Sequence, residues 1–200
     1  VTPAGNFEGR NNLHLSDSAE NLAAAYGITC ADVLAAKARA DADLLEARHR
    51  RIRPGRDDKV IAAWNGLALR AFAEAAVVLE DEAYRNVAVG IARFVTTEMV
   101  DDRGRLMRSW RNGRTSGPGF AVDYAAMAVG LLALYQTTGD VQWFSSAQRL
   151  VTGLDLLFSG ADAFYSTGTD QPQLIARLQD FMDNPLPSAN SLAAEAIVTL

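Results

Sequence analysis

The feature that most constrains the fold is a pair of helical patterns that occurs twice in the chain, 59 residues apart. In each copy an apolar segment without a polar stripe (59–79, then 122–136) precedes a segment whose apolar residues recur every three or four positions (84–99, then 141–157). A helix that is apolar on every face is buried on all sides, whereas a one-faced helix lies at the surface. The two copies align Asn65 with Tyr124, Asp81 with Asp140 and Tyr84 with Trp143.

A repeat of this kind predicts a ring of helical hairpins, and a third copy begins at "PSANSLAAEAIVTL" (187–200). In an open solenoid both helix layers usually keep a solvent-facing side, whereas in a closed ring the outer helices shield the inner ones. We therefore predict an all-α fold that is part of an (α/α)6 toroid, with short β-hairpin excursions at 101–110 and 163–166. Residues 1–200 are expected to hold about three of the roughly six hairpins of one such domain.

The N-terminal quarter reads differently from the repeats. An irregular connection (1–12) leads to a short helix with Ser16 or Asp17 as its N-cap and Gly27 as its end. A longer helix follows from Thr29 or Asp32 to about Arg51 and is ended by Pro54 and Gly55.

A basic run, "RHRRIRPGR" (48–56), ends this part of the chain and carries five arginines in nine positions. Such a run can bind phosphates. Because Glu46, Asp57 and Asp58 flank it, the pattern favours a salt-bridged helix end and loop over a nucleic-acid site.

Composition excludes several classes of function. The net charge of −5 argues against nucleic acid as the main partner, and no apolar stretch reaches the length that spans a bilayer. Cys30 is the only cysteine, which excludes an internal disulfide and a cysteine zinc site and favours a reducing, cytoplasmic location. His14 and His49 stand at no metal-ligand spacing, so we predict neither a metal nor a cofactor. Because the chain starts at Val1 and ends within a helical pattern, we expect it to be a piece of a longer protein.

Polar residues gather where each apolar helix starts, and in a toroid these starts ring one mouth of the central cavity. Carboxylates, amides and aromatic faces are the groups that bind sugars, and free N–H groups at helix N-termini add further donors. We predict Asp58 and Asp123 as a catalytic acid and base pair, because glycosidases need two carboxyl groups about 5 to 9 Å apart. The predicted substrate-binding residues are Asp57, Lys59, Trp64, Asn65, Tyr124, Ser188 and Asn190.

A purely structural interpretation exists for most of these residues. Asp57 and Asp58 are good first-turn residues in any helix, Trp64 can pack in the core, and Asp123 with Tyr124 can cap and pack. The amides of Asn65 and Asn190 favour a pocket role, because a buried amide must be satisfied. Two further residues, Arg108 and Trp110, either reach the same mouth or lie on an exposed hairpin.

Five segments carry a family resemblance: "EGRNNLHL", "RDDKVIAAWNGLAL", "DYAAMAVGLLALYQTTGD", "FYSTG" and "PSANSLAAEA". In this order and spacing they resemble the family of thioredoxin-domain-containing proteins related to spermatogenesis-associated protein 20. Two positions depart from the family's pattern, because Val122 stands in place of a glutamate and Ala189 in place of a glycine. The first departure weakens a two-carboxylate mechanism at that helix. The family's motif positions are Asp57, Asp58, Lys59, Trp64, Asn65, Gly66, Asp123, Tyr124, Pro187, Ser188, Asn190 and Ser191.

The resemblance implies an architecture rather than a reaction. In this family an N-terminal thioredoxin-like domain precedes an α/α toroid similar to the six-hairpin glycosidases and the N-acylglucosamine 2-epimerases. The chain is then expected to match an interior part of the toroid and to lack the thioredoxin-like domain, which would accompany it in the full-length protein. Cys30 matches no redox motif.

Three functions stay open at this point. The leading hypothesis is a carbohydrate-binding or carbohydrate-active toroid with the sugar in its axial cavity and, if it is an enzyme, a glycosidase- or epimerase-like activity. The rival is a non-catalytic scaffold that binds a partner or accompanies a redox domain. An epimerase-like proton shuttle needs a base near neutrality, usually a histidine, and the repeats supply none.

Overall fold

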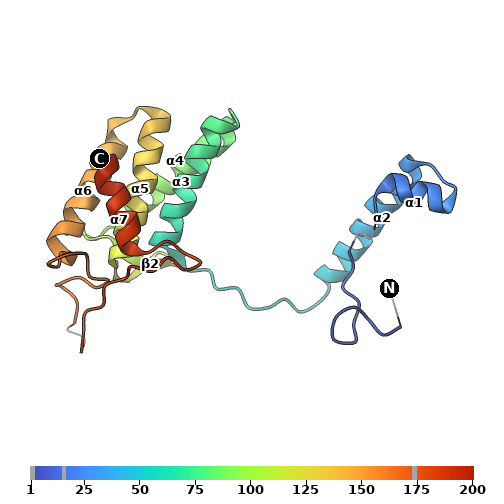
Figure 1. Cartoon of the computed structure of the whole chain (residues 1–200), viewed down its shortest axis with the longest axis horizontal. Helices are drawn as coiled ribbons and strands as arrows, with labels where there is room; N and C mark the ends of the chain where they lie inside the picture. Colours follow the sequence, from blue (N-terminus) through green and yellow to red (C-terminus); the bar gives the residue numbers. More distant parts are fainter. Residues whose placement is uncertain (1–2, 15–16, 173–174) are drawn as a thin grey trace. The chain divides into compact units, whose positions relative to one another are not determined.

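The computed structural model describes residues 3–14, 17–172 and 175–200 and divides the chain into two compact units. We call Val1–Arg56 the N-terminal unit and Asp57–Leu200 the C-terminal unit (Figure 1). That both are parts of one toroid domain stays a prediction. None of the described helices is both long and apolar enough to cross a membrane.

The N-terminal unit contains α1 (Ala19–Tyr26) and α2 (Cys30–His49). The predicted N-cap of α1 is wrong: the hydroxyl of Ser18 accepts the N–H of Asn21 at 3.2 Å, while Asp17 accepts the backbone N–H of Ser18 at 2.8 Å. Ser16, the other predicted cap, lies outside the described residues. The predicted end of α1 at Gly27 and start of α2 at Thr29, which forms a capping box with Asp32, are confirmed.

The arginine run is paired less than the sequence predicts. Arg50 pairs with Glu46, whereas Asp57 pairs with Lys59 and Asp58 pairs with Arg111 from the C-terminal unit's sheet. The sequence predicts that the arginines of the run pair with the acidic residues on either side. Among the described residues this is confirmed only for Arg50, which pairs with Glu46.

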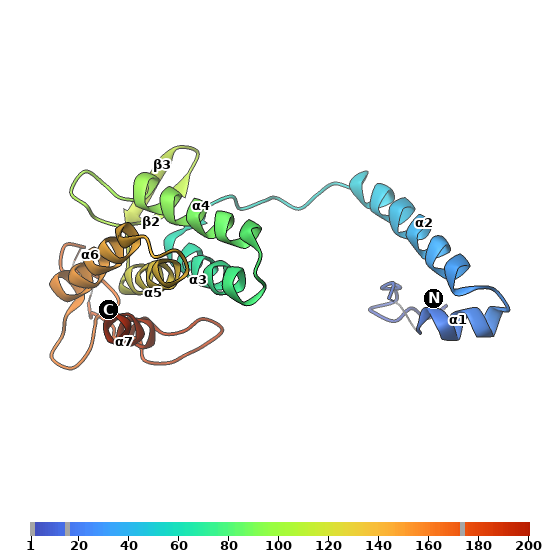
Figure 2. The same ribbon diagram turned by 90° about the horizontal axis from the view of Figure 1, so that it is seen from above.

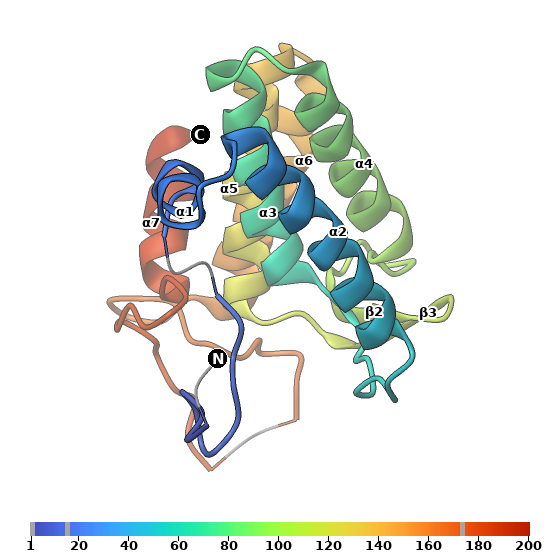
Figure 3. The same ribbon diagram turned by 90° about the vertical axis from the view of Figure 1, so that its right-hand side faces the viewer.

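The C-terminal unit is built from two complete helical hairpins and the first helix of a third. The inner helices α3 (Ala62–Val78), α5 (Ala121–Thr138) and α7 (Ala189–Thr199) lie side by side, and α4 (Glu82–Glu98) and α6 (Val141–Phe158) cover them from outside (Figures 2 and 3). All three inner helices begin at the same end of the unit (Figure 1).

The predicted repeat is confirmed at the helix starts and at the caps of the outer helices. The inner helices α3 and α5 start at Ala62 and Ala121, and the outer helices α4 and α6 start at Glu82 and Val141, so both pairs keep the 59-residue offset. The residue before each outer helix caps it in the same way. The carboxylate of Asp81 accepts an N–H two residues later at 2.8 Å, and that of Asp140 does so at 3.1 Å.

Burial separates the two inner helices that the sequence treats alike. Almost all of α5 is buried between its neighbours, as predicted. For α3 the prediction of burial on every side is wrong, because Trp64, Val77 and Val78 are exposed among the described residues, although α4 and α5 both pack against this helix. On the side that faces α5, Gly66 allows close approach: a Cβ there would lie 2.4 Å from the carbonyl carbon of Ala126.

A small antiparallel sheet lies at the end where the inner helices begin. Its order is β1 (Val60–Ile61), β2 (Met107–Arg111) and β3 (Arg114–Pro118), with a tight turn at Asn112 and Gly113, both at positive φ. The expected excursion at 101–110 thus extends further along the chain, into β3. The second excursion, at 163–166, is reduced to isolated bridges.

Candidate functional site

Strand β2 contacts both carboxylates that the sequence predicts as a catalytic pair, those of Asp58 and Asp123. Its Arg111 forms an ion pair with Asp58, and its Arg108 donates a hydrogen bond from Nη1 to Oδ2 of Asp123 at 3.1 Å. The guanidinium of Arg108 also lies 4.5 Å from the ring centre of Phe120. The two carboxylates predicted as a catalytic pair are therefore held by different arginines on one strand.

The carboxylate of Asp123 joins the starts of two inner helices. Its Oδ1 accepts the backbone N–H of Ala63, in the first turn of α3, at 3.0 Å. Its Oδ2 accepts the N–H of Phe120, the N-cap residue of α5, at 2.8 Å, in addition to the bond from Arg108. Free N–H groups at helix N-termini need such acceptors, so one side chain caps α3 and α5 together.

Asp123 has no exposed surface. Burial raises the pKa of its carboxyl group, an effect opposed by the hydrogen bond from Phe120, the charge of Arg108 and the N–H of Ala63. A group that takes a proton from a substrate must reach it, and here protein donors contact both oxygens. In the structure the carboxylate of Asp123 therefore contacts protein donors only.

Tyr124 points toward the outer helix α6. Its ring is buried against Gly153, where a Cβ would lie 2.7 Å from ring carbon Cε1, and it meets Phe158 edge-on. Its hydroxyl accepts the backbone N–H of Leu106 at 3.0 Å and an N–H of Arg105 at 2.8 Å. The structure thus places Tyr124 between helix layers and ties it to the loop that follows α4.

Ser188 and Asn190 serve the start of α7. The hydroxyl of Ser188 caps the helix by accepting the N–H of Ser191 at 3.1 Å. The amide of Asn190 accepts the N–H of Phe164 at 2.9 Å and donates to its carbonyl at 3.1 Å and to the carbonyl of Asp180 at 2.8 Å. These side chains fix the loop between α6 and α7 to the helix start.

The remaining predicted residues keep surface available for a ligand. Trp64 is 58% exposed in the first turn of α3, although a tryptophan in so apolar a helix is more often buried. Asp57, Asp58 and Lys59 are exposed just before β1. Asn65 is half-buried and donates from its amide nitrogen to the carbonyl of Ile61 at 2.9 Å, and no described residue donates to its amide oxygen.

Arg105 is a buried residue of this region that the sequence analysis missed. Its guanidinium donates to Tyr124 and to the carbonyl of Gly119 and pairs with Asp170 at 2.8 Å. In the sequence it stands in the charged turn "DDRGRL", where nothing distinguishes it from a solvated arginine. Across the described ranges no group of three acidic, histidine or cysteine side chains is placed to hold a metal.

Comparison with solved structures defines the class of fold. The chain superimposes on a cellobiose 2-epimerase from Bacillus thermoamylovorans with a TM-score of 0.60 and 18% identity, over 74% of this chain and 40% of that one. A cellobiose 2-epimerase from Spirochaeta thermophila gives a TM-score of 0.56 at 17% identity, over 70% and 38%. The predicted α/α toroid class is confirmed.

Comparison with curated proteins identifies the relatives. No family model matches the chain. It is 35% identical over 210 residues to human spermatogenesis-associated protein 20 and 36% identical over 211 residues to the protein of that name from Rattus norvegicus. These alignments cover 99% and 98% of this chain but 27% and 26% of the relatives, so the chain spans about a quarter of their length. The chain is thus related along nearly its whole length to spermatogenesis-associated protein 20, which confirms the family resemblance.

Proposed function

We propose that the C-terminal unit is part of a carbohydrate-binding α/α toroid that contacts a sugar at the end where its inner helices begin. The observation that carries the proposal is the exposure of Trp64 at this end, six residues after Asp58. An exposed indole presents a flat apolar face to the C–H face of a pyranose, and a nearby carboxylate accepts hydroxyl hydrogen bonds. Solved structures that share this fold are sugar epimerases, which supports the same class of ligand.

The role proposed for each predicted site residue depends on how exposed its side chain is. Asp58 is the exposed acid or base, Asp57 and Lys59 are hydrogen-bonding groups beside it, and Asn65 offers its amide oxygen. Asp123 is proposed as a positioning residue that keeps Arg108 and the start of α3 in place. The polar atoms of Tyr124, Ser188 and Asn190 bond within the protein, so these residues shape the region without contacting the sugar directly.

Two reactions fit an exposed carboxylate, and they leave different products. A glycosidase needs a second carboxyl group across the bond, whereas an epimerase needs a base that removes a proton next to a carbonyl carbon. Incubation of the intact protein with cellobiose separates them: hydrolysis releases glucose, and epimerisation converts the reducing-end glucose to mannose. Proton NMR of the anomeric region distinguishes both products from unreacted sugar.

Binding is the direct test, because it does not depend on the reaction. The intact protein is titrated with glucose, mannose, N-acetylglucosamine and cellobiose, with isothermal calorimetry and tryptophan emission as readouts. We expect saturable binding that Trp64→Ala weakens by roughly tenfold or more, in line with loss of an aromatic contact. Val78→Ala is the matched control, because Val78 is 79% exposed at the opposite end of α3. No binding across the panel, or equal effects of the two substitutions, contradicts the proposal.

A scaffold function is the second candidate. It is favoured by the way Asp123, Tyr124, Ser188 and Asn190 use their polar atoms for backbone groups, as structural residues do. A scaffold predicts that Asn190→Ala lowers the melting temperature while Asp58→Asn changes neither stability nor any measured binding. Under the sugar-binding proposal Asp58→Asn weakens binding or activity at unchanged stability, because an exposed ion pair contributes little to folding.

A further inference from the structure

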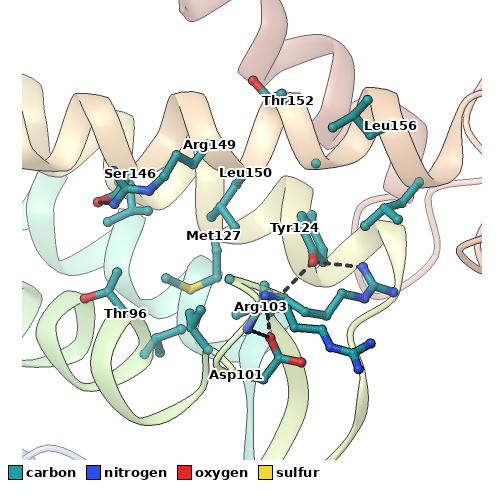
Figure 4. Close-up of a pocket in the computed structure, with 18 of the residues that line it drawn as sticks. Thr96, Asp101, Arg103, Tyr124, Met127, Ser146, Arg149, Leu150, Thr152 and Leu156 are labelled. Atoms are coloured by element: carbon teal, nitrogen blue, oxygen red, sulfur yellow. Dashed lines mark hydrogen bonds between the residues drawn. The ribbon is translucent and has the colours of Figure 1, made fainter. Parts of the chain in front are cut away.

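A groove on the outer wall of the C-terminal unit offers a second ligand site, separate from the helix-start residues proposed to contact sugar. It has a volume of about 470 Å³ and lies between α4 and α6, with α5 as its floor (Figure 4). Pockets that hold small molecules commonly measure about 300 to 1,000 Å³. Met127 and Leu131 form the floor, and Val95, Val100, Leu150 and Leu157 line the walls.

Most polar atoms that face the groove are already bonded. The hydroxyl of Tyr124 accepts from Leu106 and Arg105, and the guanidinium of Arg105 is held by Asp170. One carboxylate oxygen of Asp101 accepts the backbone N–H groups of residues 103 and 105, at 2.9 and 2.8 Å. These groups stabilise the wall and leave little hydrogen-bonding capacity for a neutral polar ligand.

The guanidinium groups of Arg103 and Arg149 at the rim differ from these bonded groups, because neither has a described carboxylate partner. In the part of the chain that the structure describes, the guanidinium of Arg103 has no hydrogen-bond or ion-pair partner. Arg149 donates from Nη2 to the hydroxyl of Ser146 at 2.8 Å and pairs with no described carboxylate. With Arg105, three guanidinium groups face two carboxylates, Asp101 and Asp170, around an apolar floor. An unpaired guanidinium is a strong donor to a carboxylate.

We propose that this groove binds an anionic amphiphile, namely a carboxylate that carries an aliphatic chain. The chain lies on the floor formed by α5, and the carboxylate is bound by Arg149 or Arg103 at the rim. Burial of the chain supplies affinity, and the guanidinium selects the charged head group. The inference does not depend on sugar binding, because none of the residues proposed to contact sugar lines the groove.

The test uses octanoate as the probe, with 1-octanol and acetate as controls that lack the charge and the chain. Calorimetric titration of the intact protein should show saturable octanoate binding, weaker binding of 1-octanol and no binding of acetate. Arg103→Gln and Arg149→Gln together should weaken octanoate binding by roughly tenfold or more, the loss expected for one charge-assisted hydrogen bond. Arg93→Gln is the matched control, because Arg93 is exposed on α4 and does not line the groove.

A second variant tests the apolar part without disturbing the core. Leu156 lines the groove and is 73% exposed, so Leu156→Asp should leave the fold intact, which circular dichroism checks, and weaken octanoate binding by charge repulsion and loss of apolar contact. Absence of saturable octanoate binding overturns the proposal. So does equal binding of 1-octanol and octanoate, or an effect of Arg93→Gln as large as that of the groove variants.

Discussion

Replacement of Asp123 by alanine tests whether one carboxylate holds the inner helices together. The substitution leaves two buried or part-buried N–H groups without an acceptor, on Ala63 and Phe120, and removes the partner of Arg108. Each unsatisfied buried N–H costs about 1 to 3 kcal/mol, whereas the Arg108 side chain is 38% exposed, so the loss of its partner adds little. We take about 3 to 5 kcal/mol for the whole change. In a unit of this size each kcal/mol lowers the melting temperature by about 2 to 4 °C, which gives a loss of roughly 6 to 20 °C.

Thermal and urea unfolding followed by far-ultraviolet circular dichroism measure this loss. Asp140→Ala is the matched control, since Asp140 caps α6 through one backbone N–H at 3.1 Å, beside an exposed bond from the side-chain amide of Gln142, and its loss should cost only about 1 kcal/mol. Our reasoning is refuted if Asp123→Ala unfolds within a degree or two of wild type. A variant that is destabilised by this amount but keeps full sugar binding would contradict the proposed positioning role of Asp123.

Three further predictions follow from the same contacts. Because burial raises the pKa of Asp123 above 3.8, the stability that this group contributes is fully present below pH 3.8 and is lost as pH rises through its folded pKa. The stability advantage of wild type over Asp123→Asn in urea unfolding should therefore shrink as pH rises above 3.8, and a constant difference contradicts this. Gly66→Ala should destabilise the protein by about 1 to 3 kcal/mol or more, because the new Cβ overlaps the backbone of α5. Gly90→Ala, in open space on α4, is the control and should stabilise the protein by about 0.5 to 1 kcal/mol. Equal shifts of the melting temperature would argue against the close approach of α3 and α5. Tyr124→Phe should cost about 1 to 3 kcal/mol in thermal unfolding, because the buried N–H of Leu106 loses its acceptor, and an unchanged midpoint would show that the bond contributes nothing.

The architecture was predictable from periodicity because burial leaves a direct trace in the sequence. A helix enclosed on all sides cannot carry a polar stripe, and α5 carries none, while the alternation in α4 and α6 reports their single covered face. The same argument failed for α3. Its sequence is as apolar as that of α5, but Trp64, Val77 and Val78 are exposed among the described residues, and periodicity records apolar character rather than the presence of a neighbour.

The site was less predictable because a helix start attracts polar residues for several reasons. Asp123 reads as the cap of its own helix, and it is, but its second backbone donor, Ala63, lies 60 positions earlier in the chain. Arg105 reads as a surface charge in a turn, although it is buried. The sequence left Arg108 either at the mouth or on an exposed hairpin, whereas in the structure it holds Asp123. Only a side chain's partners distinguish a cap from a ligand-binding group, and these partners come from distant parts of the chain.

A shared structural role accounts for several of these polar residues without a ligand. In the two complete hairpins the outer helix is followed by a loop, and a side chain at the start of the next inner helix binds that loop's backbone. Tyr124 accepts the N–H of Leu106 after α4, and Asn190 bonds both the N–H and the carbonyl of Phe164 after α6. The hydroxyl of Tyr124 and the amide of Asn190 thus both hold the preceding loop to the start of an inner helix. Because both described junctions use these side chains to bond the backbone, a ligand at this end must rely on side chains that keep exposed surface, and these include Trp64 and Asp58, although Asp58 also pairs with Arg111.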